Sequence, residues 1–177
     1  LPDREPDQRA VDAGSACNPT TTNQTSFDQE VRDVPGVNEA TPFTIELMPA
    51  GGTIFSYQNG AFFPIDDQLF GNEGNAHNYH FTFELHTKFL YQGGETFSFT
   101  GDDDLFTFIN GKLAIDLGGV HGALSATIDL AQRAAELGIR PGNVYAHDFF
   151  FAERHTTESN LRVDTSLSFV DCGEEPQ

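Results

Sequence analysis

The alternation of apolar and polar residues along the chain predicts a series of β-strands. In residues 79–89 the odd-numbered positions are mostly aromatic or aliphatic, and the even-numbered positions are polar. This period of two residues is typical of a strand that buries one side in a core and turns the other toward water. We expect further strands at residues 95–100, 105–109, 112–117, 144–151 and 161–170.

Turn and helix signals complete this pattern. Asn110-Gly111 separates two predicted strands, and an Asn-Gly pair in that position favours a type I′ hairpin turn. One short helix is predicted over residues 130–137, with Asp129 as its N-cap and Gly138 at its C-terminal end. The predicted fold class is all-β, an antiparallel β-sandwich of two sheets with one short helix.

The same pattern divides the chain into segments. Residues 1–25 are polar and show almost no apolar periodicity, so we expect an N-terminal arm or linker there. One β-sandwich domain is expected over residues 26–172, and a polar tail over residues 173–177. A chain of 177 residues with 17 phenylalanines can bury a sizeable core in one domain. We expect this domain to be a monomeric part of a larger protein.

The two cysteines, Cys17 and Cys172, lie near opposite ends of the chain. A disulfide that joins the first and last parts of one domain is the favoured interpretation, and two free buried thiols are the alternative. A redox or metal site is disfavoured, because neither cysteine has a CxxC neighbour. An oxidised pair would indicate an extracellular or cell-surface location.

Charge narrows the classes of partner. The chain has 27 Asp and Glu against 9 Lys and Arg, a net charge of −18. Such a surface repels phosphate backbones and anionic lipids, so no nucleic-acid partner is expected. No apolar run approaches the roughly 18 residues of a membrane span, so no membrane insertion is expected. The excess of carboxylates attracts cations.

The strongest chemical signal is the run Asp102-Asp103-Asp104 after a predicted strand. Three successive carboxylates repel one another, and a strand end does not need them. They form either a solvated acidic turn or a site for a hard cation, since Ca²⁺ takes about six to eight oxygen ligands. The oxygen-rich segment 153–160 is either an ordinary polar hairpin or the source of further ligands. The spacing does not fit an EF-hand.

Two long segments, FTGDDDLFTFINGKLAIDLGGVH and YAHDFFFAERHTTESNLRVDTS, resemble the fibro-slime domain, a branch of the PA14 superfamily. The segments FDQEVRDVPGVN, FFPID and HNYHFTFELHTKFLYQGGETFSF are also similar to that family, so the likeness covers roughly residues 26–170. The family often has Trp where this chain has Phe106, and Phe fills such a core position nearly as well. The resemblance implies a PA14-type β-sandwich.

The resemblance also implies a calcium site. In sugar-binding PA14 lectins, two adjacent aspartates joined by a cis peptide hold one Ca²⁺, and the ion binds sugar hydroxyls. The pattern places this pair at Asp102 and Asp103. The other metal ligands are expected from the later loop, as the side chain of Glu153 and the carbonyls of His155 and Thr157. Ligand contacts are expected from the aspartate pair and from Asp104, His121, Arg154 and Asn160.

Other chemistries are disfavoured. His77, His80, His121 and His155 form no HxH or HxxxH pair with a third zinc ligand. Carboxylate pairs arise by chance in so acidic a chain, and no nucleophile motif such as GxSxG occurs, so we do not expect an enzyme. The predicted function is a calcium-dependent carbohydrate-binding adhesion module that recognises glycans of a cell surface or extracellular matrix. The alternative is a non-catalytic structural or protein-binding module of such a matrix.

Overall fold

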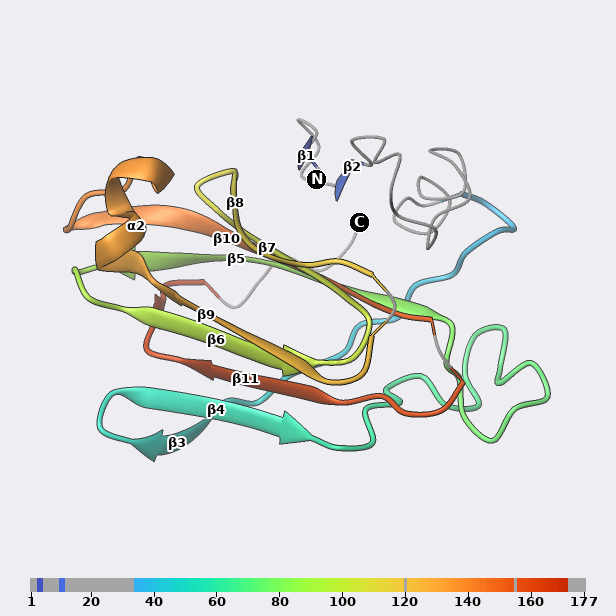
Figure 1. Cartoon of the computed structure of the whole chain (residues 1–177). Coiled ribbons are helices and arrows are strands. Elements are labelled where there is room, and N and C mark those ends of the chain that lie inside the picture. Colours follow the sequence, from blue (N-terminus) through green and yellow to red (C-terminus); the bar gives the residue numbers. More distant parts are fainter. Residues whose placement is uncertain (1–2, 5–9, 12–33, 120, 155, 172–177) are drawn as a thin grey trace.

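The computed structural model describes residues 3–4, 10–11, 34–119, 121–154 and 156–171. Its described part contains two five-stranded antiparallel sheets that pack as a sandwich (Figure 1), which confirms the predicted fold class. In spatial order, the first sheet consists of β12 (Ser168–Phe169), β5 (Phe81–Tyr91), β10 (Asn143–Glu153), β7 (Asp104–Ile109) and β8 (Lys112–Leu117). The second consists of β3 (Met48–Gly51), β4 (Ile54–Asn59), β11 (Leu161–Thr165), β6 (Thr96–Gly101) and β9 (Leu124–Asp129).

The ends of the chain are described only in part. Two short strands, β1 (Asp3–Arg4) and β2 (Ala10–Val11), pair with each other within the segment predicted as an arm. Cys17 and Cys172 lie outside the described residues, so their disulfide stays a prediction. The domain boundaries at residues 26 and 172 also lie outside them.

Most predicted strands are confirmed, and β5 shows the clearest alternation. Phe81 and Phe89 are buried while Thr82 and Lys88 are exposed, because successive side chains point to opposite faces. The prediction of a single strand over residues 161–170 is wrong. The chain leaves the second sheet after β11 and pairs with β5 of the first sheet as β12. Strands β3, β4 and β9 were not predicted.

The helix and the hairpin turn are confirmed. The helix α2 (Leu130–Leu137) begins after Asp129, whose carboxylate accepts hydrogen bonds from the backbone N–H groups of Ala131 and Gln132. It ends at Gly138, which has a left-handed φ of 69°. Asn110 and Gly111 join β7 to β8 with φ values of 53° and 71°, as a type I′ turn requires at both central positions.

An aromatic core fills the space between the sheets. Its rings come from both sheets and meet mostly edge to face or tilted, as in the pairs Phe99–Phe149 and Phe62–Phe151. A second, smaller cluster is formed by Phe108 and Phe150 with Phe106 and Leu113. The buried side chains of the main core include Phe62, Phe81, Phe89, Phe97, Phe99, Leu105, Ile109, Ile128, Phe149, Phe151, Leu161 and Val163.

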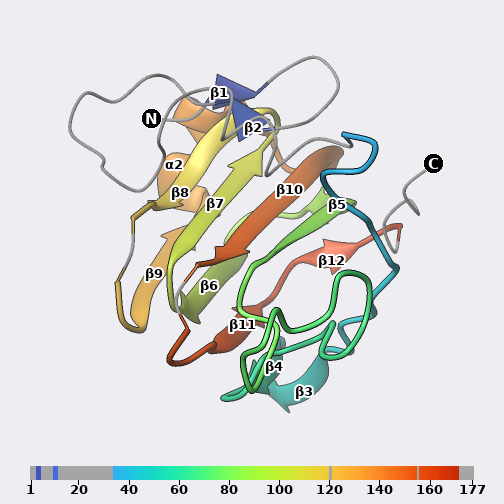
Figure 2. The ribbon, with the colours of Figure 1, turned by 90° about the vertical axis from the view of Figure 1, so that its right-hand side faces the viewer.

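The order of the strands brings four connections together at one end of the sandwich. In one sheet β5, β10, β7 and β8 are neighbours, and in the other β4, β11, β6 and β9 follow the same order. The connections between these pairs therefore lie next to one another (Figure 2). They are residues 60–80, 154–160, 102–103 and 118–123. We call the segment 101–104 the aspartate crossover and the segment 60–80 the long loop.

Candidate functional site

The aspartate crossover lies in the middle of these connections. Gly101 ends β6 opposite Leu161 of β11, and Asp104 begins β7 opposite Ala152 of β10. The side chains of Asp102, Asp103 and Asp104 come to lie inside the protein, where the three residues are 4%, 0% and 4% exposed. This burial excludes the interpretation of the segment as a solvated acidic turn.

Asp103 ties the crossover to both flanking connections. Its Oδ2 accepts a hydrogen bond from the backbone N–H of Arg154 at 2.8 Å, and its Oδ1 accepts one from the backbone N–H of His121 at 3.3 Å. Its own backbone N–H donates to the carbonyl of His121 at 3.2 Å. A charged acceptor strengthens both bonds to the carboxylate, so Asp103 fixes the relative positions of three connections.

The prediction of a cis peptide bond between Asp102 and Asp103 is wrong. The described part of the chain contains no cis peptide bond, and Asp103 instead has a φ of 56°. Aspartate adopts this left-handed conformation more readily than most residues, because its short polar side chain forms local hydrogen bonds. The chain therefore turns from one sheet into the other with trans bonds.

Asp104 is held by the chain itself. Its Oδ2 forms an ion pair with Nε of Arg154 at 2.7 Å, and its Oδ1 accepts a hydrogen bond from the backbone N–H of Gly119. The Arg154 side chain is only 17% exposed. Arg154 and Asp104 were predicted to contact a ligand, whereas in the structure they form an ion pair with each other.

Asp102 differs from its two neighbours. Its Oδ2 accepts a hydrogen bond from Nδ2 of Asn160 at 2.5 Å, so Asn160 lies at the crossover. Its Oδ1 is buried and has no hydrogen-bond partner. A buried carboxylate oxygen without a partner is costly, because it has lost its hydration and gained nothing in return.

The local charge is strongly negative. Glu153, the last residue of β10, is a further buried carboxylate at 2% exposed, although its side chain is not grouped with those of the crossover. Arg154 supplies one positive charge to this group. Taking several like charges out of water is expensive unless they are paired, so the site favours a cation.

The other predicted ligands are placed differently. His121 contributes its backbone groups to Asp103, and its ring nitrogens lie 3.0 and 3.1 Å from the carbonyls of Gly122 and Leu117. Thr157 lies in an exposed part of the loop, and His155 lies outside the described residues. Within the described part, no three Asp, Glu, His or Cys side chains are grouped so that they could hold a metal ion. Glu153 therefore does not complete a three-carboxylate set with Asp102 and Asp103.

The crossover nevertheless carries several oxygen donors. The carboxylate of Asp102 is hydrogen-bonded to the side-chain amide of Asn160, and the next residue in the chain, Asp103, carries a second carboxylate. A side-chain amide has an acceptor oxygen as well as donor hydrogens, and a half-turn of the Asn160 amide would exchange the two. Carboxylate and amide oxygens are the ligand types that a hard cation such as Ca²⁺ takes, so the chemistry of these residues fits such an ion.

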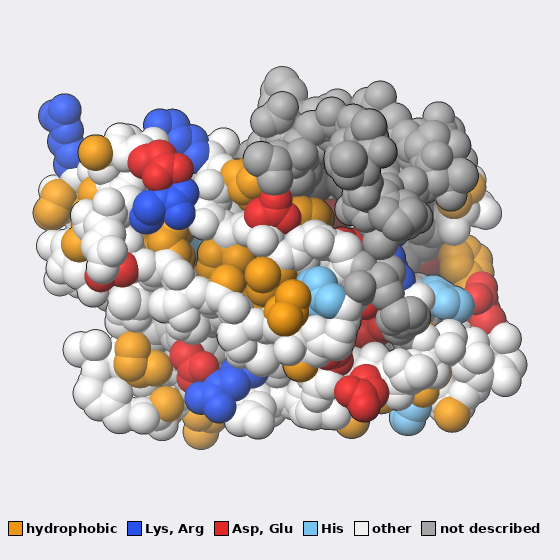
Figure 3. Space-filling model, viewed as in Figure 1, with side chains coloured by type: hydrophobic (Ala, Val, Ile, Leu, Met, Phe, Trp, Pro, Cys, Tyr) orange, Lys and Arg blue, Asp and Glu red, His pale blue; other side chains and the backbone are white. Residues whose placement is uncertain are grey.

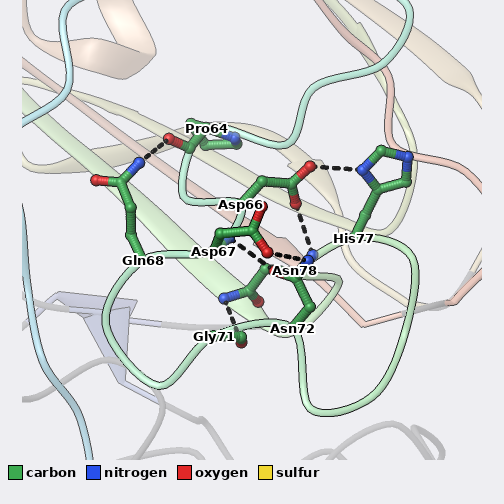
Figure 4. Close-up of polar contacts among 8 residues, drawn as sticks. All are labelled: Pro64, Asp66, Asp67, Gln68, Gly71, Asn72, His77 and Asn78. Carbon is green, nitrogen blue, oxygen red and sulfur yellow. Dashed lines mark hydrogen bonds and ion pairs between the residues drawn. The ribbon is translucent and has the colours of Figure 1, made fainter.

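The long loop forms a second polar cluster beside this site (Figure 4). Asp66 accepts hydrogen bonds from the backbone N–H of Asn78 at 2.7 Å and from Nδ1 of His77 at 2.5 Å. Asp67 and Asn72 bond each other through two contacts, and the ring of Phe63 stacks on His77. The backbone N–H of Phe62 donates to the carbonyl of Ser159 at 2.9 Å, which joins the long loop to the 154–160 connection.

Two glycines of the site were not predicted. A Cβ atom on Gly101 would lie 2.4 Å from the Phe99 ring and 2.8 Å from the backbone carbonyl of Asn160, so only glycine fits. Gly119 supplies the N–H that binds Asp104. Their positions next to the carboxylates, in the sequences GDDD and DLGG, could have indicated that they belong to the site. The long loop gave no comparable signal.

The comparisons with known proteins agree with this architecture. The family model of the PA14 domain matches residues 60–177. The chain is 41% identical to protein psiR, 40% to protein psiD and 42% to protein psiJ, all from Dictyostelium discoideum. These alignments cover 88%, 84% and 90% of this chain, but only 17%, 30% and 24% of the respective relatives. The chain thus spans less than a third of the length of these curated relatives.

A solved structure was also matched. The crystal structure of the PA14 domain of the MpAFP antifreeze protein is 15% identical, with a TM-score of 0.35. The match covers 54% of this chain and 53% of that one. In the part of this chain that the structure describes, no helix has the length and apolar character needed to cross a membrane.

Proposed function

Because the chain belongs to the PA14 domain family, we propose that it is a calcium-dependent carbohydrate-binding module whose site is the aspartate crossover. PA14 domains are binding modules of the carbohydrate-binding and adhesion type, and they occur in extracellular and surface proteins. What this proposal adds is the cation, the sugar and the residues that hold them. We place the module, with a Cys17–Cys172 disulfide, outside the cell.

One observation carries the proposal. Asp102 Oδ1 is buried without a hydrogen-bond partner, beside the buried carboxylates of Asp103 and Asp104. A protein does not retain such an arrangement without compensation, because an unpaired buried charge costs several kcal/mol. Bound Ca²⁺ would supply the missing positive charge and leave coordination positions to which sugar hydroxyls can bind.

The residues of the crossover then have separate roles. Asp102, Asp103 and the amide oxygen of Asn160 would hold the ion, together with carbonyls of the 154–160 connection. Asp104 and Arg154 hold each other and keep that connection in place. The carboxylates of the aspartate pair would also accept hydrogen bonds from the bound hydroxyls. With few apolar contacts, the affinity for one monosaccharide is expected to be about millimolar, or about −4 kcal/mol.

The test is a glycan array read in Ca²⁺ and in EDTA, with the wild type and Asp102→Asn. This substitution keeps the shape of the side chain and removes its charge. Asp66→Asn is the matched control, because Asp66 lies in the adjacent loop and is satisfied by the chain.

We expect glycan binding that is lost in EDTA and in Asp102→Asn and is retained in Asp66→Asn. Binding that survives both EDTA and Asp102→Asn would refute the calcium mechanism. A folded protein that binds no glycan in Ca²⁺ would favour the structural or protein-binding module.

A further inference from the structure

A shallow hollow of about 520 Å³ lies on the outer face of the second sheet, next to the aspartate crossover. One end of the hollow is lined by Asn59, Gly60 and Asn160. Asn160 is the residue whose amide meets Asp102. The hollow therefore begins at the proposed calcium site and extends along the sheet.

The lining of the hollow is an ordered ladder of polar side chains. Strand register places Arg162 between Gln58 of β4 and Thr100 of β6, and Thr100 in turn faces Ser125 of β9. The next row follows the same order with Asp164, Ser98 and Thr127, while Ser56, the neighbour of Asp164 on β4, lies outside the lining.

Hydrogen bonds between the strands hold both rows in place. The hydroxyls of Thr100 and Ser125 lie 2.7 Å apart, and those of Ser98 and Thr127 lie 2.6 Å apart. The guanidinium of Arg162 contacts both oxygens of Asp164 at 2.6 and 3.1 Å. The rows thus present fixed donors and acceptors, so little side-chain entropy is lost when a ligand binds.

The charge of this face points to an uncharged ligand. The chain has a net charge of −18, yet the charged side chains that line the hollow are only Arg162 and Asp164, which pair with each other. Figure 3 shows mostly white surface over these strands, with one adjoining blue and red pair. Hydroxyl, amide and guanidinium groups match the hydroxyls of a neutral sugar, whereas an acidic sugar would be repelled by the chain as a whole.

We propose that this hollow binds a neutral oligosaccharide chain whose first residue occupies the aspartate crossover. The proposal rests on the proposed function and adds the class of ligand to it. The two rows are two residues apart along the strands, about 7 Å, so a chain that starts at the crossover meets one row and then the next and contacts them with several sugar residues rather than one ring.

The experiment measures affinity against chain length. Neutral cello-, manno- and malto-oligosaccharides of one to six units are titrated into the protein in Ca²⁺ and in EDTA. The variant Thr100→Val/Thr127→Val removes one hydroxyl from each row and keeps side-chain shape and strand propensity. Thr82→Val is the matched control, because Thr82 is an exposed threonine of β5 in the other sheet.

We expect the affinity of the wild type for at least one series to rise about tenfold from one to four units. The double variant should lose this rise and keep its affinity for the monosaccharide, while Thr82→Val should behave as the wild type. A wild type that binds the monosaccharide with no gain on lengthening would overturn the proposal. A rise that the double variant retains would overturn it as well.

The EDTA arm separates this proposal from the calcium site. Length-dependent binding that persists in EDTA and is lost in the double variant would support the hollow and refute the calcium mechanism. Absence of binding to every series in both conditions, with folded protein, would refute both.

Discussion

Two acidic segments lie side by side at one end of the sandwich, and the chain satisfies them to different degrees. In the long loop, both carboxylate oxygens of Asp66 have a partner, one in Asn78 and one in His77. In the aspartate crossover, Asp102 has Asn160 on one oxygen and no partner on the other. The chain thus supplies a partner for each carboxylate oxygen of Asp66, whereas it supplies none for Oδ1 of Asp102.

These hydrogen bonds lower the pKa of Asp66. Desolvation raises the pKa of its carboxyl, but the hydrogen bonds from His77 and Asn78 and the charge of His77 outweigh it, so the net shift is downward. A lowered pKa contributes stability above the ordinary value of 3.8, and this stability is lost as the pH falls through the folded-state value. Asp66 therefore stabilises the loop at neutral pH without any added ligand.

The largest contrast is expected between Asp103→Ala and Asp66→Ala. Each aspartate accepts two hydrogen bonds, but Asp103 is fully buried and binds two backbone N–H groups. Removing the buried carboxylate leaves two part-buried N–H groups unpaired at roughly 1–3 kcal/mol each, so we expect a loss of about 4 kcal/mol for Asp103→Ala. Asp66→Ala should cost about 1 kcal/mol. Urea denaturation in EDTA measures both, and equal losses would contradict the contrast.

At acid pH the stability losses of the two aspartate variants are harder to compare, because an interior histidine titrates in the same pH range as the carboxylates. His147 is buried against Phe97, its ring nitrogens have no hydrogen-bond partner, and desolvation lowers its pKa to about 4. Above pH 6.5 it is neutral in both the folded and the unfolded state. As the pH falls from 6.5 to 4, the unfolded chain takes up a proton that the folded protein does not, so stability falls.

The expected loss from His147 is about 3 kcal/mol, from the 1.36 kcal/mol that each pKa unit represents. His147→Leu should make the fall in stability between pH 7.5 and pH 4.5 smaller by about this amount, as measured by urea denaturation at both values. His86 does not contribute to this loss. Hydrogen bonds to Asp148 and Glu84 raise its pKa to about 9, so its stabilisation is complete below pH 6.5 and is lost as the pH rises through 9. If stability falls by the same amount in His147→Leu as in the wild type, the loss of stability in acid comes from the carboxylates and not from His147.

A smaller effect is expected from two glycines that face Asn160. A Cβ on Gly101 would lie 2.8 Å from the Asn160 carbonyl, whereas a Cβ on Gly60 would lie 3.6 Å from the Asn160 side-chain oxygen. Gly101→Ala must relieve clashes with both the Phe99 ring and the Asn160 backbone, at a cost of about 2 kcal/mol. Gly60→Ala should change stability by less than about 0.5 kcal/mol. Melting temperatures of the two variants test this. An unchanged melting temperature for Gly101→Ala would show that the crossover can move to accommodate the added methyl group.

Much of the fold could be predicted from the sequence, because long strands with one buried face repeat strictly every two residues. The alternation in β5, the Asn110-Gly111 turn and the caps of α2 were all visible. Strand β9 was missed although its residues also alternate, because its apolar side is weak: position 126 is only alanine and Leu124 is exposed. The break between β11 and β12 was also invisible, because the alternation continues while the strand moves from one sheet to the other.

The site was predictable only in outline. The proximity of Asp102 and Asn160 followed from the family resemblance, since 58 residues separate them along the chain. Which oxygens of Asp103 and Asp104 are satisfied depends on backbone N–H groups from two connections, 118–123 and 154–160, and every residue type except proline supplies such groups. The ion pair of Arg154 with Asp104 likewise depends on how β10 and β7 pair, and side-chain type alone does not reveal it.

The measurement that tests the account most directly is a calorimetric titration of Ca²⁺ into EDTA-treated protein that has been freed of chelator. We predict one site in the wild type, an affinity at least tenfold weaker in Asp102→Asn, and an unchanged affinity in Asp66→Asn. At a hundredfold excess over Kd, binding to the folded state should add about 2.7 kcal/mol of stability to the wild type. A wild type that takes up no Ca²⁺, or an Asp102→Asn variant that binds it as the wild type does, would contradict the claim that the crossover is a calcium site.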